Sequence, residues 1–173
     1  MKLPEPGTQG RLLLELAAVS GDFPVRLLKC LPGQPAYRES LVKKLKKAGL
    51  LRTFYRDGLR TLRLGFPAKE LLLEENPERF SFFLMGTAET NRLKSEKTRR
   101  LRLCRMAAMY TVMQNAGVEI FRDRKPPVFS CDFSGRKRIR DPCYYGSREV
   151  KEIGLDAVKI KSSRMAGVLL TEE

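Results

Sequence analysis

Residues 10–65 read GRLLLELAAVSGDFPVRLLKCLPGQPAYRESLVKKLKKAGLLRTFYRDGLRTLRLG, and this stretch decides the fold of the first part of the chain. Its first residues place apolar side chains at helical spacing, which predicts a helix over residues 10–20 with one buried stripe. That stripe comprises Leu12, Leu13, Leu16 and Val19. Thr8 is expected to cap this helix, because its hydroxyl can accept from a free N–H of the first turn.

Two further helices follow. A two-turn helix is predicted over residues 24–31, since Pro24 is tolerated in a first turn and Pro32-Gly33 marks a turn. A third helix is predicted over residues 35–48, with Gly49 ending it. Its core side is expected to comprise Tyr37, Leu41, Leu45 and Ala48, and its solvent side Ser40, Lys43, Lys44 and Lys47.

A basic hairpin completes the stretch. Strands are predicted over residues 50–55 and 59–64, joined at Arg56-Asp57-Gly58, where glycine can adopt a positive φ. Helix, helix, helix and hairpin in this order predict a winged helix-turn-helix over residues 8–66, and the end piece of a helical bundle is the competing interpretation.

A winged helix places its third helix in the DNA major groove and its hairpin along the backbone. The predicted DNA-binding residues are Gln34, Arg38, Ser40, Lys43, Lys44, Lys47, Arg52, Arg56, Arg60 and Arg63. Lysine contacts phosphate as a point charge, whereas bidentate arginine, asparagine and glutamine read bases. The surface therefore favours phosphate contact over sequence-specific reading.

Composition supports a polyanionic partner. The chain has 173 residues, with 34 lysines and arginines against 20 acidic residues and a formal net charge of +14. Such an excess favours nucleic acid or an anionic membrane surface, and a basic surface that serves only solubility is the alternative. No apolar run reaches the roughly 18 residues of a membrane-spanning helix, and the N-terminus lacks the layout of a signal peptide. A cytoplasmic protein without membrane association is expected.

Metal and catalytic sites are not expected. The four cysteines are widely spaced, no CxxC occurs and histidine is absent, which argues against zinc and against any histidine base. No phosphate-binding or dinucleotide-binding glycine loop is present, so no cofactor is predicted. Carboxylates that only the fold could bring together for metal-dependent nuclease chemistry occur late in the chain: Asp132, Asp141, Glu149, Glu152 and Asp156. Their spacing specifies nothing, and a non-enzymatic protein is predicted.

The rest of the chain predicts a helical connector over residues 67–117 and a small mixed α/β domain over residues 118–173, so the fold class is α+β. In the connector, a helix opens at Pro67 and restarts at Asn76-Pro77, and a long helix covers residues 87–116. Strands are predicted over residues 118–121 and 165–170, and Ser147 as a helix cap. A second basic surface is predicted to comprise Arg99, Arg100, Arg136, Lys137, Arg138 and Arg140.

The segment Tyr145-Gly-Ser-Arg-Glu-Val-Lys, followed by Lys161-Ser-Ser-Arg-Met-Ala-Gly-Val-Leu-Leu-Thr, resembles winged-helix proteins of conjugative elements and plasmids of Gram-positive gut bacteria. Those proteins resemble the replication-relaxation group and pair an N-terminal winged helix with a mixed α/β domain that is loosely nuclease-like in fold. They continue well past the corresponding strand, whereas this chain ends at Glu173. The resemblance implies a truncated chain or a shortened relative.

Together these observations predict a DNA-binding accessory protein of replication or transfer, or a transcriptional regulator, of a bacterial mobile element. The second half is expected to dock a partner, a second copy of the chain or more DNA. The alternative is an inhibitor of the anti-CRISPR type, which would bind a guide-loaded CRISPR nuclease or its DNA. Shortness and charge are the grounds for this alternative.

Overall fold

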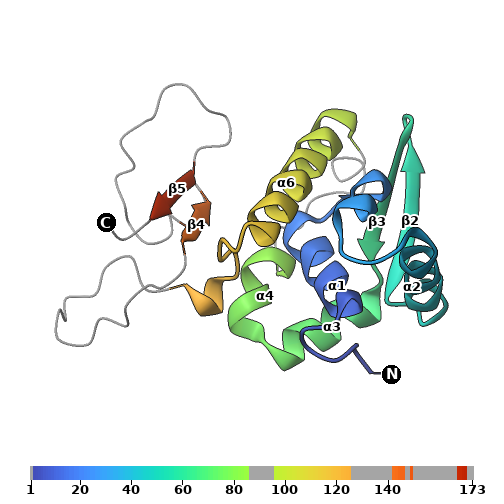
Figure 1. Ribbon diagram of the computed structural model, residues 1–173, viewed down its shortest axis with the longest axis horizontal. Coiled ribbons are helices and arrows are strands. Elements are labelled where there is room, and N and C mark those ends of the chain that lie inside the picture. Colours follow the sequence, from blue (N-terminus) through green and yellow to red (C-terminus); the bar gives the residue numbers. More distant parts are fainter. Residues whose placement is uncertain (1, 86–95, 126–141, 147–148, 150–166, 171–173) are drawn as a thin grey trace. The chain divides into compact units, whose positions relative to one another are not determined.

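The protein is described here from a computed structural model, which covers residues 2–85, 96–125, 142–146, 149 and 167–170 (Figure 1). The chain is mixed α+β and divides into two compact units, Met1–Val112 and Met113–Glu173. Within the described ranges, no helix has the length and apolar character needed to cross a membrane.

The first unit is built around a small antiparallel sheet. Its elements up to the hairpin are α1 (Gln9–Ser20), β1 (Phe23–Pro24), the 3-10 helix η1 (Val25–Cys30), α2 (Pro35–Lys47), β2 (Leu51–Arg56) and β3 (Leu59–Leu64). The strand order is β1-β3-β2, so the hairpin supplies two neighbouring strands and β1 pairs with the other edge of β3. Figure 1 shows α1 between the hairpin and the helix α4 (Pro77–Leu84), both of which it contacts.

Helix α1 confirms the first predicted helix and its cap, since the Thr8 side chain accepts from the Arg11 N–H at 3.3 Å. The predicted stripe is too narrow, however. Every residue from Leu13 to Ser20 is buried, while Leu12 is only half-buried. A helix buried on most sides loses the one-sided pattern that the sequence argument assumed.

The predicted second helix is confirmed in part: it is a 3-10 helix that begins after Pro24. Phe23 and Pro24 are extended and pair with Leu62 and Thr61 of β3, and the 3-10 helix η1 follows. Proline favours extended geometry in the residue before it, and Phe23 is fully buried in the core. Pairing with β3 therefore takes the place of a first α-helical turn.

Helix α2 confirms the third predicted helix, but its core side is thinner than predicted. Leu45 is buried at 3% exposure, Leu41 is half-buried, Tyr37 is 50% exposed and Ala48 is exposed. The helix therefore touches the rest of the unit along a narrow line around Leu45 and presents most of its circumference to solvent.

The hairpin confirms the two predicted strands. Arg56 pairs with Leu59, and the two residues between them, Asp57 and Gly58, have φ of 53° and 73°. Two consecutive positive φ values characterise the tight turn that best matches the twist of paired strands. At the other end of β3, a side-chain carbon on Gly65 would collide with the backbone oxygen of Gly49, so glycine is required there.

Three helices follow the hairpin: α3 (Phe66–Glu75), α4 and α6 (Lys97–Asn115). The predicted restart at Asn76 is confirmed, because its side chain accepts from the Arg79 N–H at 2.9 Å. Arg79 also pairs with Glu15 of α1 at 3.1 Å, and Glu15 accepts from Arg11 Nε at 2.8 Å. The structure thus groups the helices after the hairpin with the module predicted for residues 8–66.

The second unit contains the antiparallel pair β4 (Cys143–Gly146) and β5 (Gly167–Leu170). The strand predicted over residues 165–170 is confirmed in its described part. The strand predicted over residues 118–121 is wrong: Glu119 forms a single bridge with Cys143, and Arg122–Arg124 is a 3-10 helix. The predicted cap Ser147 lies outside the described residues, as does the beginning of the predicted long helix.

Candidate nucleic-acid interface

The exposed side of α2 carries a cluster of lysines. Lys43 and Lys47 lie opposite Leu45 around the helix axis, and Lys44 and Lys46 flank them. All four are exposed, and they are called the lysine face below. Ser40, also predicted for this side, is exposed as well. Sequence reasoning missed Lys46, although its place one residue beyond the core residue Leu45 already put it at the margin of that side.

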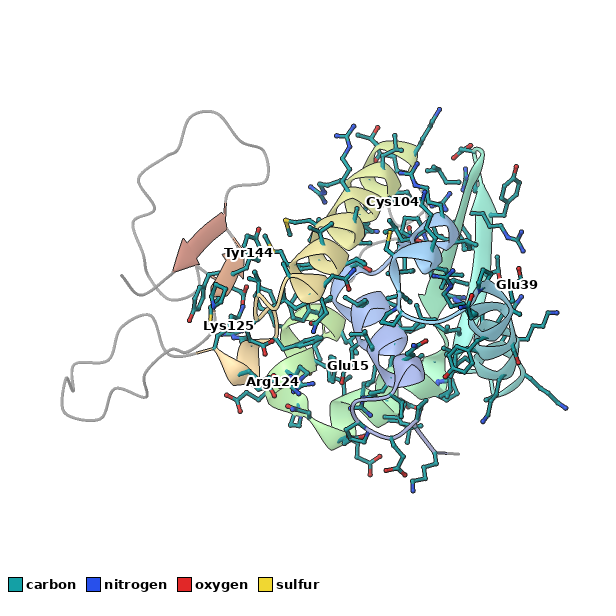
Figure 2. The ribbon with its side chains drawn as sticks, viewed as in Figure 1. Glu15, Glu39, Cys104, Arg124, Lys125 and Tyr144 are labelled. Atoms are coloured by element: carbon teal, nitrogen blue, oxygen red, sulfur yellow. The ribbon has the colours of Figure 1, made fainter. Side chains whose placement is uncertain are left out.

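Helix geometry helps to hold these charges together. Lys44, Lys46 and Lys47 lie in the last turn of α2, where the negative end of the helix dipole offsets part of their mutual repulsion. Figure 2 shows Glu39 on the same helix, and it is exposed. From residue 34 to residue 64 the chain carries nine lysines and arginines against the two acids Glu39 and Asp57. This part of the surface is therefore strongly electropositive.

The hairpin adds three exposed arginines, Arg52, Arg56 and Arg60, as predicted. Arg56 Nε lies 3.7 Å from the Asp57 carboxylate, and both side chains are largely exposed. An exposed pair of this kind is weak, so Arg56 can exchange Asp57 for another anion. Tyr55, opposite Arg60 in the strand register, is 69% exposed and was missed. Strand alternation places Tyr55 on the same sheet face as the buried Leu51, so the sequence pattern alone does not indicate that Tyr55 is exposed.

The prediction that Arg63 is a DNA-binding residue needs correction. Its Nε and Nη2 donate to the two oxygens of Asp22 at 2.6 and 2.7 Å, and its side chain is 14% exposed. The guanidinium carbon also lies 3.8 Å from the centre of the Phe54 ring. A bidentate pair with a fully buried carboxylate commits Arg63 to the fold rather than to phosphate.

The two residues predicted at the beginning of α2 differ in their surroundings. Arg38 Nη1 donates to the carbonyl oxygens of Lys29 and Leu31 at 2.8 and 2.9 Å, which fixes the turn between η1 and α2. Gln34 is the exposed N-cap residue, and its side chain makes no capping hydrogen bond. Gln34 can therefore approach a ligand, while Arg38 mainly positions the helix.

The predicted second basic surface needs a correction at Arg100, which is fully buried. Its guanidinium donates to Asp22, to Thr61 and to two carbonyl oxygens of the hairpin. Arg99 is half-buried. The other predicted members lie outside the described residues: Arg136, Lys137, Arg138 and Arg140. The charged first half of α6 thus contributes a structural arginine, which helical charge patterning alone does not reveal.

The buried charges around Asp22 affect their neighbours. Burial raises the pKa of the Cys104 thiol, and the negative charge of Asp22 raises it further, against the opposing effect of Arg100. Figure 2 shows Cys104 on α6, and its exposure is 4%. A thiol of this kind is a poor nucleophile at neutral pH. The ion pairs of Asp22 with Arg63 and Arg100 hold the loop before β1, the hairpin and α6 together.

The second unit contains its own buried ion pair. Lys125 Nζ donates to Glu149 and, at 3.0 Å, to the carbonyl oxygen of Tyr144, and Glu149 also accepts from the Gly146 N–H at 2.9 Å. Burial lowers the pKa of Lys125, and the paired carboxylate partly opposes this effect. Burial also raises the pKa of Tyr145 to about 12. These contacts tie Lys125 and Glu149 to β4.

Comparison with protein-family models, with curated proteins and with solved structures finds no match to this chain. The resemblance to winged-helix proteins of mobile elements stays a prediction from the sequence.

Proposed function

We propose that the first unit contains a winged helix-turn-helix that binds double-stranded DNA without catalysing a reaction on it. The order α1, β1, η1, α2, hairpin and the strand order β1-β3-β2 support this interpretation, because α2 then takes the position of a recognition helix and β2–β3 that of a wing. The observation that carries the proposal is the lysine face: four exposed lysines lie on a helix whose opposite side packs on the hairpin.

In this proposal the lysine face approaches the major groove, with Lys43 and Lys47 foremost. Gln34 and Ser40 are the polar side chains nearest to base edges. Arg52, Arg56 and Arg60 neutralise the neighbouring phosphates, and Tyr55 packs beside them. Lysine and arginine contacts to phosphate give affinity that is independent of sequence and falls steeply with salt. We therefore expect binding that depends far more on charge than on base sequence.

The proposal is tested by titrating the full chain into a fluorescently labelled random-sequence duplex and following anisotropy at near-physiological salt. Non-specific binding of this type has dissociation constants on the order of 10⁻⁴ to 10⁻⁶ M under such conditions. Saturable binding in or below that range supports the proposal. No binding in low salt would refute it, because low salt strengthens every phosphate contact.

A second arm of the same titration adds unlabelled single strands of equal length. A duplex binder is displaced less efficiently by single strands than by duplex, since α2 fits the groove of a double helix. Equal displacement by unlabelled single strands and by unlabelled duplex would contradict the winged-helix arrangement and leave charge alone as the cause of binding. The setting predicted from the sequence, an accessory or regulatory protein of a mobile element, rests on the resemblance and stays a prediction.

A further inference from the structure

The buried guanidinium of Arg100 joins α6 to the end of the hairpin. Its Nη1 donates to the carbonyl oxygen of Arg56 at 2.7 Å, and its Nη2 donates to that of Leu59 at 3.0 Å. Arg56 and Leu59 are the pair that closes the two-residue turn. Because Arg100 is fully buried, these charge-assisted bonds are partly shielded from competing water, although the turn that accepts them is more exposed.

Arg100 holds the turn end of the hairpin, where β1 no longer pairs with β3. β1 pairs with β3 at Thr61 and Leu62, and the pairs closer to the turn are Tyr55 with Arg60 and Arg56 with Leu59. A two-stranded hairpin is marginally stable at best in water. Contacts from outside the sheet are therefore needed to fix the direction of residues 55–60, and Arg100 supplies two of them.

The same guanidinium is anchored at its other side. Nε lies 3.4 Å from an oxygen of Asp22, and Nη2 donates to the Thr61 hydroxyl at 3.2 Å. The guanidinium carbon lies 4.6 Å from the centre of the Phe54 ring, whose electron-rich face attracts cations. The buried positive charge of Arg100 would otherwise be costly, and it is offset by Asp22, the Phe54 ring and the two carbonyl oxygens.

We infer that Arg100 is a positioning residue for DNA binding: it fixes the hairpin so that Arg56, Arg60 and Tyr55 are already arranged for the duplex. This inference rests on the function proposed above. Its physical basis is preorganisation, because a hairpin that is ordered before binding loses less conformational freedom on the DNA. Arg100 itself contacts no nucleic acid and acts through the hairpin.

The test compares Arg100→Gln with Arg79→Gln in the full chain. Each change removes one of two arginines around a buried carboxylate: Asp22 keeps its bidentate pair with Arg63, and Glu15 keeps Arg11. Neither variant therefore leaves a carboxylate without a cation. The two networks differ in their partners: the Arg100 side chain donates to carbonyl oxygens at the hairpin turn, whereas the Arg79 side chain donates to Glu15 of α1.

Hydrogen exchange on the free protein is the first measurement. Arg100→Gln is expected to speed amide exchange in residues 54–61. Exchange in α1 should change no more in Arg100→Gln than it does in Arg79→Gln. Duplex affinity at a temperature where both variants are folded is the second. Arg100→Gln is expected to bind about tenfold more weakly than wild type, a change of roughly 1.4 kcal/mol, and Arg79→Gln within about twofold.

Unchanged exchange in the hairpin, or wild-type affinity in Arg100→Gln, would overturn the inference. Equal losses of affinity in both variants would also overturn it, because they would indicate a general effect of stability. If the wild-type protein binds no duplex, the proposed function is wrong, and the exchange experiment alone decides whether Arg100 holds the hairpin.

If Arg100→Gln does not fold, Arg100→Lys replaces it. Lysine keeps the positive charge near Asp22 but donates from a single atom, so it cannot reach both carbonyl oxygens as the planar guanidinium does. The same faster exchange and weaker binding are expected, and wild-type values of either would refute the positioning role.

Discussion

Replacing Asp22 by asparagine should strongly destabilise the first unit. The carboxylate is fully buried and accepts from Arg63 at 2.6 and 2.7 Å, from Thr61 at 2.8 Å and from Arg100 at 3.4 Å. Asparagine removes the negative charge and turns an N–H group towards one of the guanidinium donors. Breaking a buried ion pair in this way costs about 3–5 kcal/mol.

That cost is a large share of the total stability of a domain, roughly 5–15 kcal/mol. With a urea dependence of about 2 kcal/mol per molar, the unfolding midpoint should fall by about 2 M. Circular dichroism during urea titration measures it. The matched control is Asp57→Asn, the same chemical change at an exposed residue with φ of 53°, a conformation that asparagine tolerates. If the urea midpoints of Asp22→Asn and of the control are equally close to wild type, the buried network does not stabilise the fold as argued.

Three further predictions concern other parts of the chain. Leu45→Asp should abolish the cooperative thermal melt of the first unit, because it buries a carboxylate that has no partner. Leu41→Asp should keep a cooperative melt, because Leu41 is only half-buried. A wild-type melt for Leu45→Asp would mean that Leu45 does not face the core. Burial and a raised pKa should make Cys104 react with iodoacetamide more slowly than the exposed Cys30, and peptide mapping that finds equal rates in the folded protein would contradict this. The pKa of Tyr145 is about 12 in the fold and 10.0 ordinarily, so the folded chain keeps a proton that the unfolded chain loses, and the stability of the second unit should fall as pH rises between these values. Burial also raises the pKa of Tyr144, so Tyr145→Phe should weaken this dependence and not abolish it; an unchanged dependence would contradict the prediction.

Local patterns predicted the elements that depend on neighbouring residues. The cap at Thr8, the turn at Asp57-Gly58 and the restart at Asn76 are all set within a few residues, and each is confirmed. Three of the four lysines of the lysine face were predicted for the same reason, because the position of a residue around a helix follows from its spacing to Leu45.

The roles of Arg63 and Arg100 could not be predicted in this way. Their shared partner Asp22 is 41 residues from Arg63 and 78 from Arg100, and no periodicity marks it as buried. An arginine on a strand that alternates with leucine has the same local pattern whether it meets phosphate or a buried carboxylate. The exposure of Tyr37 was not predicted either, because the width of the contact that α2 makes depends on the elements packed against it and not on the spacing within the helix.

The central claim, that the lysine face contacts DNA phosphates, is tested most directly by the salt dependence of duplex binding. The variant is Lys43→Ala with Lys44→Ala and Lys47→Ala, and the control removes three exposed cations from α6: Lys97, Arg102 and Arg105. Both variants lose the same net charge, so a difference between them reports position. All the substituted residues are exposed, so both variants should melt like wild type.

We predict that the plot of log affinity against log salt loses about one unit of slope for each phosphate contact removed, up to about three units in the α2 variant. The α6 control should keep a slope close to that of wild type. A slope and an affinity for the α2 variant equal to those of the α6 control would contradict the account, because binding would then follow net charge rather than the lysine face.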